Sequence, residues 1–189
     1  MAEKKSKEWV DWIKLIVAAL IIALVVRKFF FSPIIVDGPS MQPTLFDQDK
    51  MIVNKFIYAI KQPERFDIVI FHANDEKDFI KRVIGLPGEH VEVEDNILYI
   101  NGEEVEQPFL EPDEENDHIY PIFTHDFTLE KLNGNYEVIP PNYILVLGDN
   151  RNNSTDSRSS SLGLVHIDDI VGKTSFIFWP FERIHVIKK

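Results

Sequence analysis

The chain begins with a basic segment and then has twelve consecutive apolar residues, 15–26, which constrain its fold more than any other feature. As a helix this run spans only about 18 Å, which is short of the ~30 Å hydrocarbon core of a bilayer. Extending it to residues 9–31 gives about 34 Å, provided that three basic side chains reach the interface. These are Lys14, Arg27 and Lys28. The sequence therefore predicts a short N-terminal segment, 1–8, and one transmembrane anchor, 9–31.

Two other interpretations of the apolar run stay open. A cleaved secretory signal peptide also starts with basic residues, but no small-x-small pair follows the run, only Arg-Lys-Phe-Phe-Phe at 27–31. A core helix that is apolar on all sides would need a large core around it. Four basic residues precede the run and two follow it, which favours a cytoplasmic N-terminus and an extracytoplasmic remainder at the plasma membrane.

Beyond the anchor the chain is strongly acidic. It has 20 Lys and Arg against 31 Asp and Glu, a net charge of −11, and residues 1–31 carry +3, so the remainder carries −14. This charge argues against nucleic-acid binding, which needs a basic face. The absence of cysteine excludes disulfide frameworks, iron–sulfur clusters and thiol nucleophiles. The six histidines form no His-x-x-x-His pair, so a zinc site or His-based triad has little support, and no metal or cofactor is expected.

Residues 32–189 are expected to form a mainly β domain, an antiparallel sheet or barrel-like structure. Short β-branched runs separated by turn residues recur at strand length, and no helical pattern is convincing after residue 31. Asn101 and Gly102 favour a type I′ hairpin turn between strands at 97–100 and 103–105. The other expected strands are 34–36, 51–53, 67–71, 91–93, 143–147 and 171–179.

An acidic segment interrupts this pattern at residues 103–117, which contain eight acids and no base. Two prolines, Pro108 and Pro112, break it further. A solvated loop is the simplest interpretation. A calcium site is the sharper alternative, but the segment lacks the Asp-x-Asp-x-Asn-Gly spacing that orders carboxylates around the ion.

Three further segments place polar residues among turn residues or apolar strands. In 36–45 a glycine and two prolines fix the backbone around Ser40. In 78–89 Lys81 lies among apolar residues before a Gly-Leu-Pro-Gly turn, and 148–158 is dense in hydrogen-bonding groups just after an apolar strand. Taken singly, these segments have ordinary explanations: a turn serine, an edge-strand charge and an Asx-rich loop.

In this order, the three segments resemble the type I signal peptidases, membrane-anchored Ser/Lys proteases that remove signal peptides from exported proteins. The matching motifs are Ser-Met-x-Pro-Thr-Leu from Ser40, Lys-Arg-x-x-Gly-x-Pro-Gly from Lys81, and Gly-Asp-Asn-Arg-x-x-Ser-x-Asp-Ser-Arg from Gly148. The resemblance covers nearly the whole chain. A lysine instead of a histidine points to the bacterial and organellar branch, and one anchor with a short chain looks like the Gram-positive type.

The resemblance implies that Ser40 is the nucleophile, Lys81 the general base and Ser154 a residue that orients the lysine amine. It also implies a supporting polar cluster, in which Arg82 would pair with an aspartate. This cluster comprises Asp149, Arg151, Asp156, Arg158 and Arg82. Some family members have a serine two residues before the nucleophile, where this chain has Gly38. The oxyanion hole would then depend chiefly on the Ser40 backbone N–H, with a second donor left open.

A lysine base must be buried, because at its reference pKa of ~10.4 less than ~1% of it is neutral at pH 8. The implied partners are the lipid bilayer and exported preproteins, whose signal peptides end in small residues at the −3 and −1 positions. Two shallow apolar pockets beside the nucleophile would accept such residues. The candidate pocket walls are Val36, Leu45, Phe79 and Ile80, for which a plain core role is equally open.

Two competing functions belong to other classes. A self-cleaving Ser/Lys repressor protease would need an N-terminal helix-turn-helix and an Ala-Gly site, and this chain has an apolar run there and no Ala-Gly dipeptide. A membrane-tethered acidic β domain that binds an exported partner would need no catalytic pair. In that case Ser40 and Lys81 would lie well beyond hydrogen-bond reach. The oligomeric state is not determined by the sequence.

Overall fold

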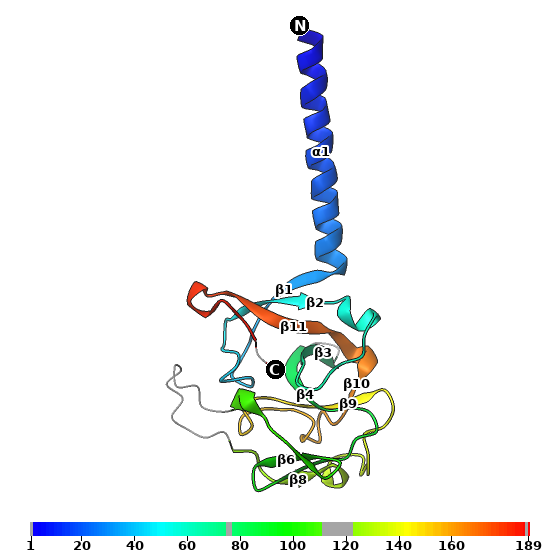
Figure 1. The fold of residues 1–189 in the computed structure, drawn as a ribbon, viewed down its shortest axis with the longest axis vertical. Helices are drawn as coiled ribbons and strands as arrows, with labels where there is room; N and C mark the ends of the chain where they lie inside the picture. Colours follow the sequence, from blue (N-terminus) through cyan, green and yellow to red (C-terminus); the bar gives the residue numbers. More distant parts are fainter. Residues whose placement is uncertain (1, 75–76, 111–122, 188) are drawn as a thin grey trace.

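The computed structural model describes residues 2–74, 77–110, 123–187 and 189. One helix, α1 (Ala2–Phe29), stands apart from a β domain and has the N-terminus at its far end (Figure 1). Of its apolar residues Leu15 is 62% exposed and Leu24 57%. The side chains at 1–8, 10 and 25–29, which include those of Arg27 and Lys28, lie outside the described part.

The helix starts seven residues before the expected anchor, because the polar segment 2–8 continues it. In the part of the chain that the structure describes, no helix is both long enough and apolar enough to cross a membrane.

After α1 the chain forms two antiparallel sheets, as the strand-length runs predict. The large sheet has the order β1 (Phe31–Ile35), β2 (Lys50–Asn54), β11 (Ile170–Trp179), β3 (Ile68–Asn74), β4 (Lys77–Gly85), β9 (Tyr143–Leu147) and β10 (Val165–His166), and β12 (His185–Val186) pairs with β11. The small sheet has the order β7 (Glu103–Val105), β6 (Ile97–Ile100), β5 (Val91–Glu94) and β8 (Phe127–Thr128). Short 3₁₀ turns complete the described elements: η1 (Ile57–Ala59), η2 (Pro108–Leu110), η3 (Leu129–Lys131), η4 (Ile167–Asp169) and η5 (Phe181–Arg183).

The predicted hairpin is confirmed between β6 and β7. Asn101 has a φ of 54° and Gly102 a φ of 81°, which are the two left-handed positions of a type I′ turn. Residues 103–105 are therefore a strand, which shortens the expected acidic loop at its start, and η2 follows shortly afterwards. The remainder of that expected loop, 111–117, lies outside the described residues.

Strand β4 was not among the expected strands, because the adjacent charges of Lys81 and Arg82 interrupt its apolar pattern. Its partner β3 lies along its length, with Val69 opposite Lys81. On the other side β9 pairs with β4 only from Arg82 onward, opposite Leu147. Among the residues that the structure describes, the first half of β4 therefore has one edge without a partner strand, and this edge ends at Lys81.

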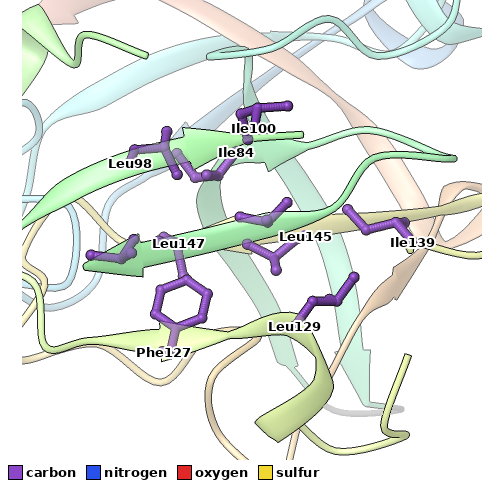
Figure 2. Close-up of a cluster of buried hydrophobic side chains, with 10 residues drawn as sticks. Ile84, Leu98, Ile100, Phe127, Leu129, Ile139, Leu145 and Leu147 are labelled. Atoms are coloured by element: carbon purple, nitrogen blue, oxygen red, sulfur yellow. The ribbon is translucent and has the colours of Figure 1, made fainter. Parts of the chain in front are cut away.

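A buried apolar cluster joins the small sheet to β4 and β9 (Figure 2). One side comes from the large sheet and the other from the small sheet and the loops around it. The labelled members are Ile84, Leu98, Ile100, Phe127, Leu129, Ile139, Leu145 and Leu147. Gly85 permits the close packing, because an added Cβ would lie 2.5 Å from Ile139 Cδ1. The cluster thus fixes the strands that lead to Lys81 and to the 148–158 segment.

We expect Leu145→Ala to lower the free energy of unfolding by about 2–5 kcal/mol, because the Leu145 side chain is fully buried in this cluster and its loss leaves a cavity. The matched control is Val138→Ala, at a side chain that is 48% exposed, which should change stability by less than about 0.5 kcal/mol. Urea unfolding of the full chain in detergent measures both. Equal midpoints for the two variants would contradict the assignment of this cluster as the core.

Candidate active site

Ser40 lies in the connection between β1 and β2, in a turn that the third polar segment holds from outside. Gly38 has a φ of 90°, a conformation that favours glycine. The Asn150 backbone N–H donates to Ser40 O (3.1 Å), and its side-chain amide donates to Pro39 O (3.1 Å). The nucleophile candidate is therefore fixed by a loop more than a hundred residues away in the sequence.

Lys81 reaches this turn from β4. Its Nζ lies 2.8 Å from Ser40 Oγ and 2.9 Å from Ile80 O, and Lys81 is only 4% exposed. Burial lowers the pKa of Lys81 to about 8, although the charges of Asp156 and Asp149 oppose the shift. A substantial fraction of the amine is therefore neutral in mildly alkaline solution, next to a serine hydroxyl.

Ser154 lies close to Ser40 but makes no hydrogen bond with the lysine amine. Among the described residues its buried Oγ has no hydrogen-bond partner, and the amine bonds to Ser40 and Ile80 instead. Ser154 packs against Gly148, where an added Cβ would come within 2.6 Å of Ser154 Cβ and would also contact Ser40 O. The family resemblance implies that Ser154 orients the Lys81 amine, but in this structure no hydrogen bond joins the two groups.

A fully buried ion pair lies behind the dyad. Arg82 Nε donates to Asp149 Oδ1 (2.9 Å), and its Nη2 donates to Oδ2 (2.7 Å), with both side chains at most 1% exposed. The Thr44 hydroxyl donates to the same carboxylate (2.5 Å). Because Thr44 is four residues after Ser40, this pair links β4, the nucleophile turn and the 148–158 segment. In the sequence, Thr44 stands out only as a member of the Ser-Met-x-Pro-Thr-Leu motif.

The second half of the polar cluster is organised around Asp156. Arg158 donates to both of its oxygens (2.8 and 2.7 Å), and the Gly148 backbone N–H donates to Asp156 Oδ2 (3.0 Å). Arg158 also donates to the backbone carbonyl of Arg151 (2.8 Å). Arg151 itself is 2% exposed and pairs with no carboxylate of the residues that the structure describes, but donates to Thr124 Oγ1 (2.9 Å) and Gln107 Oε1 (2.6 Å).

The backbone around Gly38 was the open part of the expected oxyanion hole. The Gly38 N–H donates to Asp47 Oδ1 (2.9 Å), so this amide is already engaged. A second donor at Gly38 therefore requires Asp47 to release it, and the Ser40 backbone N–H stays the principal expected donor.

A groove of about 760 Å³ opens at Ser40 and Lys81. Three of the four expected pocket walls, Val36, Phe79 and Ile80, line it. Leu45 does not, because it is fully buried in a core cluster beneath the groove with Met41 and Met51. The residues that sequence reasoning did not assign to the groove are Ile34, Ile35, Asp37, Pro39, Met41, Ile70, Asp78, Asn152, Asn153 and Thr155. Most of them are neighbours in the sequence of residues that were assigned to the site, and this adjacency could have indicated them.

We expect Asp149→Asn to lower the free energy of unfolding by about 3–5 kcal/mol, because it leaves the Arg82 charge buried without its carboxylate. Glu64→Gln removes one partner of the exposed Lys189–Glu64 pair and should cost less than about 1 kcal/mol. Urea unfolding of the full chain measures the difference. Similar losses in the two variants would mean that the Arg82–Asp149 pair is not buried in solution.

Three bacterial signal peptidases are similar to this chain over nearly its whole length. Signal peptidase I of Bacillus caldolyticus is 44% identical over 181 residues, which cover 96% of this chain and 94% of that protein. Signal peptidase I T of Bacillus subtilis (strain 168) is 41% identical over 189 residues, covering 99% and 94%. Signal peptidase IB of Staphylococcus aureus is 42% identical over 181 residues, covering 94% and 93%.

A solved structure and a family match agree with these relatives. The crystal structure of a signal peptidase I from Enterococcus faecalis V583 is similar with a TM-score of 0.52 at 40% identity, covering 60% of this chain and 97% of that chain. The family described as signal peptidase, peptidase S26, matches residues 9–179, a span that contains Ser40, Lys81 and the 148–158 segment. The family resemblance predicted from the motifs is confirmed: this chain belongs to the signal peptidase family, peptidase S26.

Proposed function

We propose that this chain is a membrane-bound serine endopeptidase that removes signal peptides from exported preproteins, with Ser40 as nucleophile and Lys81 as general base. One observation carries the proposal: the buried Lys81 amine, with its pKa lowered to about 8, lies 2.8 Å from Ser40 Oγ. This is the geometry that a general base needs to remove a hydroxyl proton. The named relatives, which are signal peptidases, support the substrate class.

In the first step neutral Lys81 takes the Ser40 proton while Oγ attacks the carbonyl carbon of the substrate residue at −1. The developing oxyanion accepts a hydrogen bond from the Ser40 backbone N–H. Collapse of the tetrahedral intermediate breaks the peptide bond, and Lys81 returns the proton to the leaving amine of the mature chain. The signal peptide stays bound to Ser40 as an ester.

In the second step Lys81, neutral again, removes a proton from water, which attacks the ester carbonyl. Collapse of this intermediate breaks the ester bond and releases the signal peptide, and the Lys81 ammonium returns the proton to Ser40 Oγ. When protonated, the Lys81 ammonium has three donors, of which Ser40 and Ile80 O occupy two. The buried Ser154 hydroxyl, which has no hydrogen-bond partner in the described part of the chain and lines the same groove, is the acceptor that we propose for the third.

The groove fits an extended peptide. It is bordered by β1, which is the edge strand of the large sheet, and by the half of β4 that has an unpaired edge. Substrate backbone can pair with such edges, which leaves alternate side chains to fill pockets. Val36, Phe79 and Ile80 provide apolar walls beside Ser40, and in this proposal they limit the −1 and −3 positions to small residues.

Neither competing function is favoured by the geometry. A binding protein without catalysis predicts separated Ser40 and Lys81 side chains, and these are within hydrogen-bond distance. A repressor protease predicts an N-terminal helix-turn-helix, whereas residues 2–29 form one continuous helix.

We also propose that residues 9–31 anchor the chain in the plasma membrane, with residues 1–8 in the cytoplasm and the β domain outside. The support is the exposure of the apolar run: in the described part of α1, the residues from Leu15 to Leu24 have no buried member. The free energy of the chain falls when lipid replaces the water around exposed apolar side chains on such a helix. The excess of basic residues before the run favours this orientation.

We expect Ser40→Ala and Lys81→Ala to lower kcat by about 10³-fold or more, because each removes one half of the dyad. Wild-type activity on a peptide with an Ala-x-Ala site should rise through about pH 8, as Lys81 loses its proton and becomes the base. Cleavage by the full chain in detergent, followed from about pH 6 to about pH 10, measures both effects.

Lys61→Ala is the matched control for the loss of a lysine, because Lys61 is exposed and lies outside the groove, and it should retain activity. The same peptide with Phe at −1 should not be cleaved. Near-normal turnover by Lys81→Ala, or a rise in activity only near the ordinary lysine pKa, would rule out the proposed base.

We expect the full chain to stay in membranes after alkaline carbonate washing. Replacing Leu20 and Ile21 together with Arg should release it, because each Arg at the bilayer centre costs about 2.5–3.5 kcal/mol. Ile60→Arg, at a 64%-exposed residue of the β domain, is the control and should stay bound. Fractionation and immunoblotting measure the distribution, and a wild-type chain that carbonate extracts would refute the anchor.

A further inference from the structure

The residues just before and within η2 contact both buried arginines behind the dyad. Gln107 precedes this turn and Phe109 lies within it, directly after the small sheet ends at β7. No sequence motif marks either residue. Their contacts reach the two halves of the polar cluster separately, one at Arg82 and the other at Arg151.

Phe109 covers the Arg82 guanidinium. The guanidinium carbon lies 3.8 Å from the ring centroid, within the range in which a cation is attracted to the face of an aromatic ring. Phe66 holds the ring edge-on at 5.0 Å and accepts a hydrogen bond from Arg82 Nη1 through its carbonyl (3.0 Å). Phe109 thus covers a face of the fully buried cation that pairs with Asp149.

From Asp149 the contact path to Ser40 is short. The carboxylate accepts the Thr44 hydroxyl, and the next residue, Asn150, donates twice to the backbone of the nucleophile turn. Arg82 is also the residue after Lys81 on β4. A rotation of the Arg82 guanidinium would therefore act on both members of the dyad.

Gln107 contacts the second buried cation, Arg151, as a hydrogen-bond acceptor. This arginine is buried, and in the described part of the chain it has no carboxylate partner. It donates to Gln107 Oε1 and Thr124 Oγ1, while its Nε has no partner among the described residues. Its backbone carbonyl accepts from Arg158, which holds Asp156. Loss of the Gln107 acceptor would leave a second donor group of this cation without a partner, at the centre of the 148–158 segment.

We propose that Phe109 and Gln107 are positioning residues of the peptidase site, which set the Ser40–Lys81 geometry through the Arg82 and Arg151 guanidinium groups. Neither residue lines the groove, so each acts on the chemical step and not on substrate binding. The inference rests on the proposed function, because it concerns the same dyad.

The test compares Phe109→Leu, which keeps the apolar volume and removes the ring face, with Phe109→Tyr, which keeps both. Phe109→Leu should lower kcat about tenfold with KM within about twofold, and Phe109→Tyr should restore most of kcat. Gln107→Ala should act like Phe109→Leu, and Gln107→Glu, which keeps an acceptor for Arg151, should be close to wild type. Cleavage of the Ala-x-Ala peptide by the full chain in detergent measures all four variants.

Leu132→Ala is the matched control, because Leu132 packs against the same core cluster as Phe109 and its aliphatic side chain offers a guanidinium neither an acceptor nor a ring face. It should lower the unfolding midpoint at least as much as Phe109→Leu while leaving kcat near wild type. Equal kcat losses in Leu132→Ala and Phe109→Leu, or an unchanged kcat in Phe109→Leu, would overturn the positioning role alone. Absence of cleavage by the wild type would overturn the proposed function, and this inference with it.

Discussion

The structure depends on keeping the Lys81 amine out of water beside a serine. Burial lowers the pKa of Lys81, which the proposed base role requires, whereas the charges of Asp156 and Asp149 stabilise its protonated form. Each of these carboxylates is held by its own arginine, Arg158 for the first and Arg82 for the second. The arginines compensate the two negative charges, which limits their effect on Lys81. The paired carboxylates can therefore hold the Thr44 hydroxyl and the Gly148 backbone N–H near the lysine.

This arrangement requires three distant segments to meet within a small volume. Gly148 makes the meeting possible, because a side chain there would collide with Ser154 and with the backbone of Ser40. The strands that bring the segments together, β4 and β9, are fixed from behind by the apolar cluster that also carries the small sheet. The small sheet therefore contributes to the site without providing a member of the dyad.

The sequence predicted those elements whose conformation is determined by neighbouring residues in the chain, and it missed those that depend on distant contacts. The β6–β7 hairpin was predictable, because Asn101 and Gly102 favour left-handed backbone conformations whatever surrounds them. Strand β4 was not, because two charges are tolerated inside it only through partners from other strands and loops. For Leu45 the sequence left a pocket wall and a core position equally open, because its place next to the nucleophile turn does not reveal on which side of the backbone the core lies, and the structure places it in the core. The contact of Phe109 with Arg82 joins a turn after the small sheet to a strand of the large sheet and has no sequence signature.

The position of the groove relative to α1 connects the chemistry with the proposed location. The helix ends at Phe29 and β1 begins at Phe31, and by Ile34 the chain already lines the groove that leads to Ser40. If α1 crosses the bilayer as proposed, the groove must open within a few residues of the membrane surface. A signal peptide held in the same bilayer would present its extended, small-residue end at that height. The short connection between anchor and edge strand would then restrict which peptide bonds can reach Ser40, in addition to the walls formed by Val36, Phe79 and Ile80.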